Sequence, residues 1–85
     1  MKISYVKTVI MEEFERNFVT PKIEASFHKG LYRVLVCVDS VLGGKDCVSR
    51  SFTDLEIDMV KLSSHDFLVN FAKRLYEDLF DKSRN

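Results

Sequence analysis

The chain has little of what marks fibrous, flexible or exported proteins. Its 85 residues include no tryptophan, one proline and three glycines, which excludes a collagen-like repeat and a flexible linker. Thirteen basic side chains balance thirteen acidic ones, so there is no surplus of Lys and Arg for general binding of nucleic-acid phosphates. No apolar run approaches the ~20 residues of a membrane-spanning helix, and no signal-peptide segment follows Met1. We therefore expect a cytoplasmic protein without a membrane partner.

The chain does have a large apolar share for its length. Apolar residues make up 46% of the sequence and include seven Phe and three Tyr, which is too much for a disordered chain and enough for one hydrophobic core. No repeat, low-complexity stretch or Gly/Ser linker divides the sequence. It is therefore expected to form a single compact domain over residues 1–85.

The cysteines and histidines predict no metal site. Cys37 and Cys47 are expected to be free thiols packed as small hydrophobic side chains, because a compartment reached without export keeps thiols reduced. A zinc site needs about four nitrogen or sulfur ligands, usually including a close pair. His28, His65 and the two cysteines are scattered singly along the chain. We therefore expect neither a metal nor a cofactor.

The N-terminal segment fits two structures. Apolar side chains recur there at the spacing of one helix face, which favours a helix over residues 4–18, with the charged residues from Glu12 to Arg16 in solvent and an end before Pro21. Many of the same residues are strand formers, so a strand over residues 2–10 followed by a short helix is the alternative. The apolar stripe consists of Ile3, Val6, Ile10, Phe14 and Phe18.

From Lys22 onward apolar and polar residues alternate, which indicates strands with one buried face. A two-residue turn at residues 29–30 would join the first two strands and set their apolar side chains on one face. The pairs in this register are Phe27–Tyr32, Ala25–Val34 and Ile23–Val36.

A third strand is predicted over residues 47–53, after a loop centred on residues 42–44. Gly43 and Gly44 supply the positive φ that such a loop requires, and they lack the spacing of a phosphate-binding loop. The expected register sets Val48 beside Val38 and Phe52 beside Val34. It also places Arg50 on the core face, near an edge where its guanidinium reaches water.

Residues 54–62 fit two structures as well. Leu55, Ile57 and Met59 alternate with acidic residues, which favours a fourth strand, and this is the prediction we adopt. The alternative is a short helix, because Thr53 and Glu56 have the spacing of a capping box.

The last element is the clearest. Ser63 and Asp66 form a capping box, Leu62 and Phe67 form the matching hydrophobic staple, and an amphipathic helix of about 18 residues follows. The polar residues 82–85 are expected to fray.

These elements predict a two-layer α+β domain. An antiparallel meander of three or four strands packs against a C-terminal helix and an N-terminal one. The order helix, three strands, helix is also that of double-stranded RNA-binding domains, which grip phosphates with lysines at the start of the second helix. Residues 63–67 read SSHDF there, so no family is assigned. Binding of RNA or DNA is an alternative function, with the contacts Lys29, Arg33, Lys45 and Arg50.

No catalytic constellation is evident. His28 and Cys37 lie about six residues apart along adjacent predicted strands, too far for a hydrogen bond. His65 falls in the first turn of the last helix, where the helix dipole opposes a positive charge. The chain is therefore predicted to be a non-enzymatic module that binds another protein. Its small size suggests an accessory or inhibitor protein of the kind that phages and mobile elements encode.

Two surfaces are candidates for the partner. Alternating carboxylates on the predicted fourth strand project to one side, and the start of the last helix adds another, which makes an acidic surface. The outer face of the sheet is the second candidate, for a partner or a homodimer of structural role, unless the N-terminal segment covers it. The acidic surface consists of Asp54, Glu56, Asp58 and Asp66, and the outer face of Leu31, Leu35 and Cys37.

Overall fold

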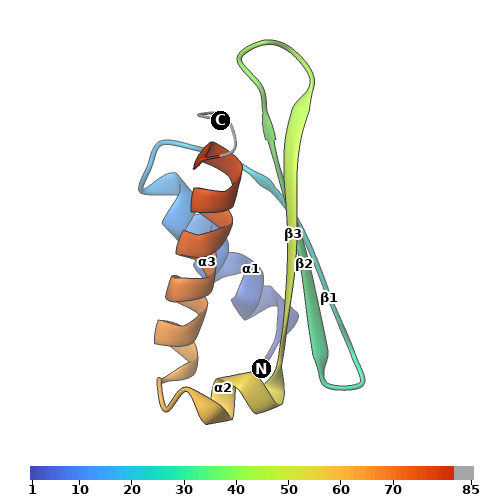
Figure 1. Cartoon of the computed structure of the whole chain (residues 1–85), viewed down its shortest axis with the longest axis vertical. Coiled ribbons are helices and arrows are strands. Elements are labelled where there is room, and N and C mark those ends of the chain that lie inside the picture. Colours follow the sequence, from blue (N-terminus) through green and yellow to red (C-terminus); the bar gives the residue numbers. More distant parts are fainter. Residues whose placement is uncertain (82–85) are drawn as a thin grey trace.

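A computed structural model describes residues 1–81, so the expected fraying of residues 82–85 lies outside the described part of the chain. Its sheet is antiparallel with the strand order β1-β2-β3, and its helices lie at both ends of the sequence (Figure 1). This confirms the predicted α+β fold. The elements are α1 (Ile3–Glu15), β1 (Lys22–His28), β2 (Leu31–Asp39), β3 (Lys45–Thr53), α2 (Asp54–Met59) and α3 (Ser64–Asp81).

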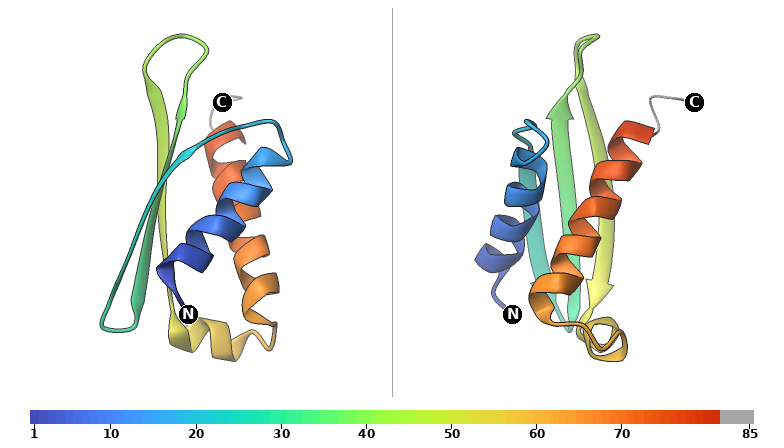
Figure 2. Two further views of the ribbon diagram at one scale, coloured as in Figure 1. Left: turned by 180° about the vertical axis from the view of Figure 1, so that it is seen from behind. Right: turned by 90° about the vertical axis from the view of Figure 1, so that its left-hand side faces the viewer.

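Both long helices pack on one face of the sheet, α1 beside β1 and α3 beside β3 (Figure 2). The core lies between the two layers, and there the Tyr32 and Phe52 rings stack with their centroids 4.7 Å apart. Within the described residues no element covers the other face. The N-terminal segment therefore does not shield it. The largest fully buried side chains are Tyr32, Phe14, Phe52, Ile10, Leu68 and Leu75.

The helix predicted at the N-terminus is confirmed, but it ends three residues early. The Val19 N–H donates to the Phe14 carbonyl and the Phe18 N–H to the Glu15 carbonyl, and Phe18 adopts a φ of 61°. These are the bonds and the left-handed residue of a Schellman motif. The turn points Phe18 out of the stripe, so its predicted burial is wrong: the side chain is 98% exposed.

The first hairpin forms in the predicted register. Lys29 and Gly30 both have positive φ, 50° and 81°, as the type I′ turn of a two-residue hairpin requires. All three predicted pairs are present in the β1–β2 ladder.

The second hairpin is two residues out of the predicted register. Val48 pairs with Val36, not with Val38, and Phe52 pairs with Tyr32. The loop spans five residues because Ser40 closes it: its N–H donates to the Gly44 carbonyl at 3.0 Å and its Oγ accepts from the Leu42 N–H at 3.3 Å. A shift of two residues keeps every side chain on its predicted face.

This register sets Cys37 directly opposite Cys47, and the two form a disulfide with their Cα atoms 4.1 Å apart. The prediction of two free thiols is therefore wrong. The predicted register would have placed Ser49 opposite Cys37, whereas the free thiols were predicted from an expected reducing compartment.

The segment after β3 is helical, which corrects the predicted fourth strand. The Thr53 Oγ1 accepts from the Glu56 N–H at 3.1 Å, and α2 follows directly. Asp54 and Glu56 in the first turn also favour a helix through its dipole. α3 confirms the last prediction: it has 18 residues, and the Ser63 Oγ accepts from the Asp66 N–H at 3.1 Å.

Removing the disulfide is expected to lower the free energy of unfolding by about 2–3 kcal/mol, because the bond joins cysteines 10 positions apart and restricts the unfolded chain. Urea unfolding of the wild type and of the Cys37→Ser/Cys47→Ser variant, each with and without reductant, measures this. Reductant should lower the stability of the wild type to that of the variant and leave the variant unchanged. Two titratable thiols in the unreduced native protein would contradict the bond.

Candidate functional site

The outer face of the sheet is open but mostly polar. Leu31, Leu35 and Cys37 lie on it as predicted, each partly buried. Arg33 lies between Leu31 and Leu35 on this face of β2, and the neighbours of Leu35 across the sheet, Glu24 and Ser49, are polar. The predicted apolar patch is therefore a narrow row that a charge interrupts, and Cys37 in that row is bonded to Cys47.

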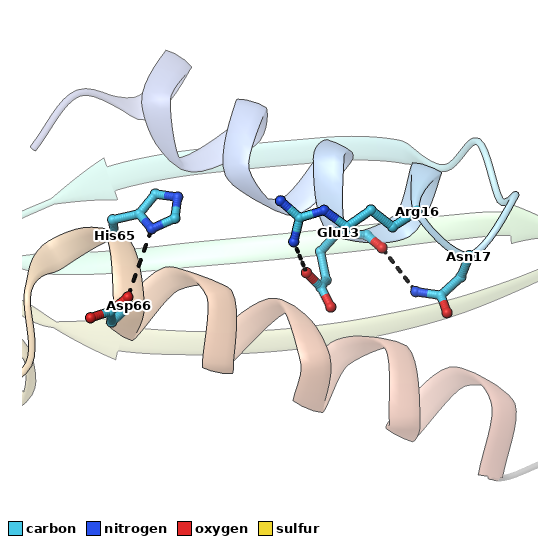
Figure 3. Close-up of polar contacts among 5 residues, drawn as sticks. All are labelled: Glu13, Arg16, Asn17, His65 and Asp66. Atoms are coloured by element: carbon cyan, nitrogen blue, oxygen red, sulfur yellow. Dashed lines mark hydrogen bonds and ion pairs between the residues drawn. The ribbon is translucent and has the colours of Figure 1, made fainter.

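The predicted acidic residues do not form one row. Successive residues of a helix turn by about 100°, so Asp54 and Asp58 lie on one side of α2 and Glu56 on the other. The Asp66 Oδ1 lies 3.8 Å from the His65 Nδ1 on α3 (Figure 3).

Asp54 also affects a core residue, Tyr32. Burial raises the pKa of the Tyr32 hydroxyl, and a hydrogen bond with the Asp54 carboxylate raises it further.

The four basic residues of the nucleic-acid alternative are dispersed. Lys29 lies in the β1–β2 turn and Lys45 at the start of β3, at opposite ends of the sheet. Arg33 pairs with Ser51 and Val34 with Arg50, so the two arginines project from opposite faces. The structure brings no two of these residues into one positive surface.

A groove of about 380 Å³ lies between α2, the first half of α3 and β3. We call it the α2–β3 groove. Three of its lining side chains are apolar and exposed: Met59, Val60 and Leu62, with Met59 at 70%. α2 has no buried side chain, so the apolar residues around it reach solvent. The full apolar lining consists of Phe52, Met59, Val60, Leu62, Phe67 and Phe71.

Charged side chains border this groove. Arg50 pairs with Asp78 across β3 and α3, and that hydrogen bond holds the pKa of Arg50 above its ordinary value. Glu56 and Arg74 also line the groove. Arg74 has no ion pair among the side chains of residues 1–80. The Arg50–Asp78 pair is neutral and Glu56 balances Arg74, so the groove has no net charge, and Arg74 is the arginine available to a carboxylate.

The opposite end of the molecule has a different character. The β2–β3 hairpin extends beyond both helices (Figure 1), and Val41 and Leu42 at its tip are fully exposed. The turn after α1, which carries Phe18, lies toward the same end. The three most exposed large apolar side chains are therefore all at the end away from α2.

The turn after α1 is held by a buried carboxylate. Glu13 is 7% exposed, which corrects its predicted place on a solvated face. The Arg16 Nη1 lies 3.0 Å from the Glu13 Oε2, and the Asn17 Nδ2 donates to the Glu13 carbonyl at 2.9 Å (Figure 3). These contacts lie directly before Phe18, whose left-handed φ of 61° turns its side chain out of the stripe.

Catalytic and metal-binding groups are dispersed in the described part of the chain. His28 lies opposite Leu31 and Cys37 opposite Lys22 in the β1–β2 ladder, as predicted. Residues 1–81 contain no group of three or more His, Cys, Asp or Glu that could hold a metal ion. Among the same residues no helix is long and apolar enough to span a bilayer.

Comparison with known protein families, with curated proteins and with solved structures gives no match to this chain. The α2–β3 groove and the hairpin tip were missed in the sequence. The signal for the groove was present: residues 55–62 hold more apolar side chains than a six-residue helix can bury.

Replacing Phe18 by glycine is expected to raise the free energy of unfolding by about 1 kcal/mol, because glycine adopts a positive φ without steric cost. The exposed side chain has little packing to lose. Phe18→Ala is the control, since it removes the ring but keeps the Cβ that causes the strain. Urea unfolding of the three proteins measures the effect, and equal stability of the Gly and Ala variants would show that the turn is unstrained.

Proposed function

We propose that this protein is a non-catalytic binding module whose α2–β3 groove recognises a segment of another protein. The observation that carries the proposal is the exposure of Met59, Val60 and Leu62 around a groove with a further apolar lining. Apolar surface in water costs about 25 cal/mol per Å², and small monomers rarely expose a contiguous patch of it without an interaction to make.

The edge of β3 adds a preference for an extended segment. β3 pairs with β2 alone among the described strands. Closely spaced antiparallel pairs, such as Cys37 and Cys47, are those whose residues do not hydrogen-bond to each other. The backbone groups of Cys47, and of Ser49 and Ser51 at the same alternation, therefore point away from β2. A partner strand could accept and donate hydrogen bonds there.

The charged side chains at the groove indicate the chemistry of the partner further. Arg74 has no ion pair among the side chains of residues 1–80, while Arg50 already pairs with Asp78. The best complement is an extended segment with adjacent aliphatic side chains and a nearby carboxylate. An accessory or inhibitor role of the kind encoded by phages and mobile elements fits such a module, and only its small size supports that role.

The cytoplasmic location stays a prediction. It rested on the lack of an export signal, and the Cys37–Cys47 disulfide weighs against it, since cytosolic proteins are kept reduced.

The test is capture from the native cell followed by reconstitution. The immobilised protein is incubated with cell extract, the captured protein is identified by mass spectrometry, and its affinity is measured after purification. Met59→Glu should weaken binding by roughly tenfold or more, because it removes apolar contact and opposes the partner's carboxylate. Ser26→Glu, an equal change of charge on the outer face, should leave the affinity unchanged.

One further double variant, compared with Met59→Glu, distinguishes the acidic surface from the groove. Asp54→Asn/Asp58→Asn removes two carboxylates from the side of α2 opposite Glu56. If this double variant loses the captured protein while Met59→Glu keeps it, the acidic surface is the binding site and the groove proposal is wrong.

A further inference from the structure

We propose that one occupant of the α2–β3 groove is the β2–β3 hairpin tip of a second copy, so that copies associate head to tail. The inference rests on the proposed function, because it uses the same groove. Its evidence is the tip itself, which matches the partner chemistry derived from the groove: two adjacent aliphatic side chains with carboxylates nearby.

The tip is an exposed apolar projection. Val41 and Leu42 are fully exposed, and no described residue packs on them. The last three-stranded row of the sheet is Lys22–Cys37–Cys47, so the hairpin beyond it consists of two strands only. The disulfide joins those two strands at the base of this extension. A cross-linked tip loses little conformational entropy on binding.

One charged group at the groove complements the tip. Asp39 and Asp46 flank the tip with Lys45 between them, which leaves one net negative charge. At the groove Asp78 neutralises Arg50 and Glu56 balances Arg74, so the groove has no net charge. Arg74 has no ion pair among the side chains of residues 1–80 and could pair with a tip carboxylate. That ion pair forms only when a tip meets a groove, which favours this contact over tip-to-tip or groove-to-groove contacts.

The tip and the groove are placed so that copies can join end to end. The molecule measures 39 × 22 × 22 Å, and the tip and α2 lie at opposite ends of the long axis (Figure 1). In the head-to-tail contact that we propose, one copy keeps a free groove and the other a free tip, so the contact is heterologous and builds chains or rings. An antiparallel pair in which each tip enters the other copy's groove is the two-fold alternative, and it stops at a dimer.

The association is expected to be weak. A hairpin tip in a groove buries much less surface than a stable interface needs, so a dissociation constant on the order of 100 µM is expected. Sedimentation velocity from 10 µM to 1 mM should show an average mass that rises with concentration and passes that of a dimer.

Two variants test the contact from its two sides. Val41→Ser/Leu42→Ser removes the apolar tip, and Met59→Glu blocks the groove. Each protein alone should associate at least tenfold more weakly than the wild type. All three positions are exposed, and circular dichroism with urea unfolding verifies that each variant keeps the fold. Ser26→Glu is the control and should associate like the wild type.

Mixing the two variants is the decisive step. The tip variant keeps an intact groove and the groove variant keeps an intact tip, so an equimolar mixture should form a 1:1 complex and nothing larger. A mixture that stays monomeric while the wild type associates would show that one tip in one groove does not hold two copies together, and it would overturn the inference. A wild type that is monomeric at 1 mM would overturn it too.

Failure of this inference and failure of the proposed function are distinguishable. If the wild type stays monomeric but captures a partner that the Met59→Glu variant does not bind, only the head-to-tail contact is wrong. If copies associate through tip and groove but the Met59→Glu substitution weakens binding of no captured protein, only the proposed binding of another protein is wrong.

Discussion

The register in which β2 pairs with β3 is the constraint on which the rest of the structure depends. It sets Tyr32 opposite Phe52, whose stacked rings lie between the sheet and α3. It also sets Cys37 opposite Cys47, so that a disulfide forms where the third strand of the sheet ends. A slip of two residues would keep every side chain on its face of the sheet, but it would separate both the Tyr32–Phe52 pair and the Cys37–Cys47 pair. The core, the cross-link and the length of the projecting hairpin therefore share one cause.

Periodicity predicted the layers and could not predict this register. Alternation specifies which face a side chain occupies, and registers that differ by two residues satisfy it equally. In the observed register the Ser40 hydroxyl accepts from the Leu42 N–H in a five-residue loop, and Tyr32 stacks on Phe52, and alternation contains neither contact. Alternation was also insufficient for the segment after β3. Alternation of Leu55, Ile57 and Met59 suggested a strand, but the Thr53 cap on the Glu56 N–H began a helix.

The candidate site was less predictable than the fold, because its parts come from three separate segments. The sequence identified acidic residues that lie close together along the chain, and the turn of α2 then separated Glu56 from Asp54 and Asp58. The α2–β3 groove combines Phe52 of β3, Met59 of α2 and Arg74 of α3. The apolar residues at 55–62 are visible in the sequence, but their meeting with Phe52 and Arg74 exists only once the helices are packed.

The distribution of exposed apolar side chains follows from the same packing. One layer of helices is shorter than the strands it covers, so β2 and β3 extend past it at one end, and the short α2 leaves apolar side chains around it exposed at the other. The β2–β3 extension is a two-stranded hairpin, which is marginally stable by itself. The disulfide at its base holds the two strands together there, so Val41 and Leu42 are displayed on a defined projection. At the end of α1, Phe18 is likewise displayed, at the cost of a left-handed backbone conformation. Apolar residues held outward by a cross-link or by a strained turn are costly in an isolated monomer, and contact with another protein surface would offset that cost.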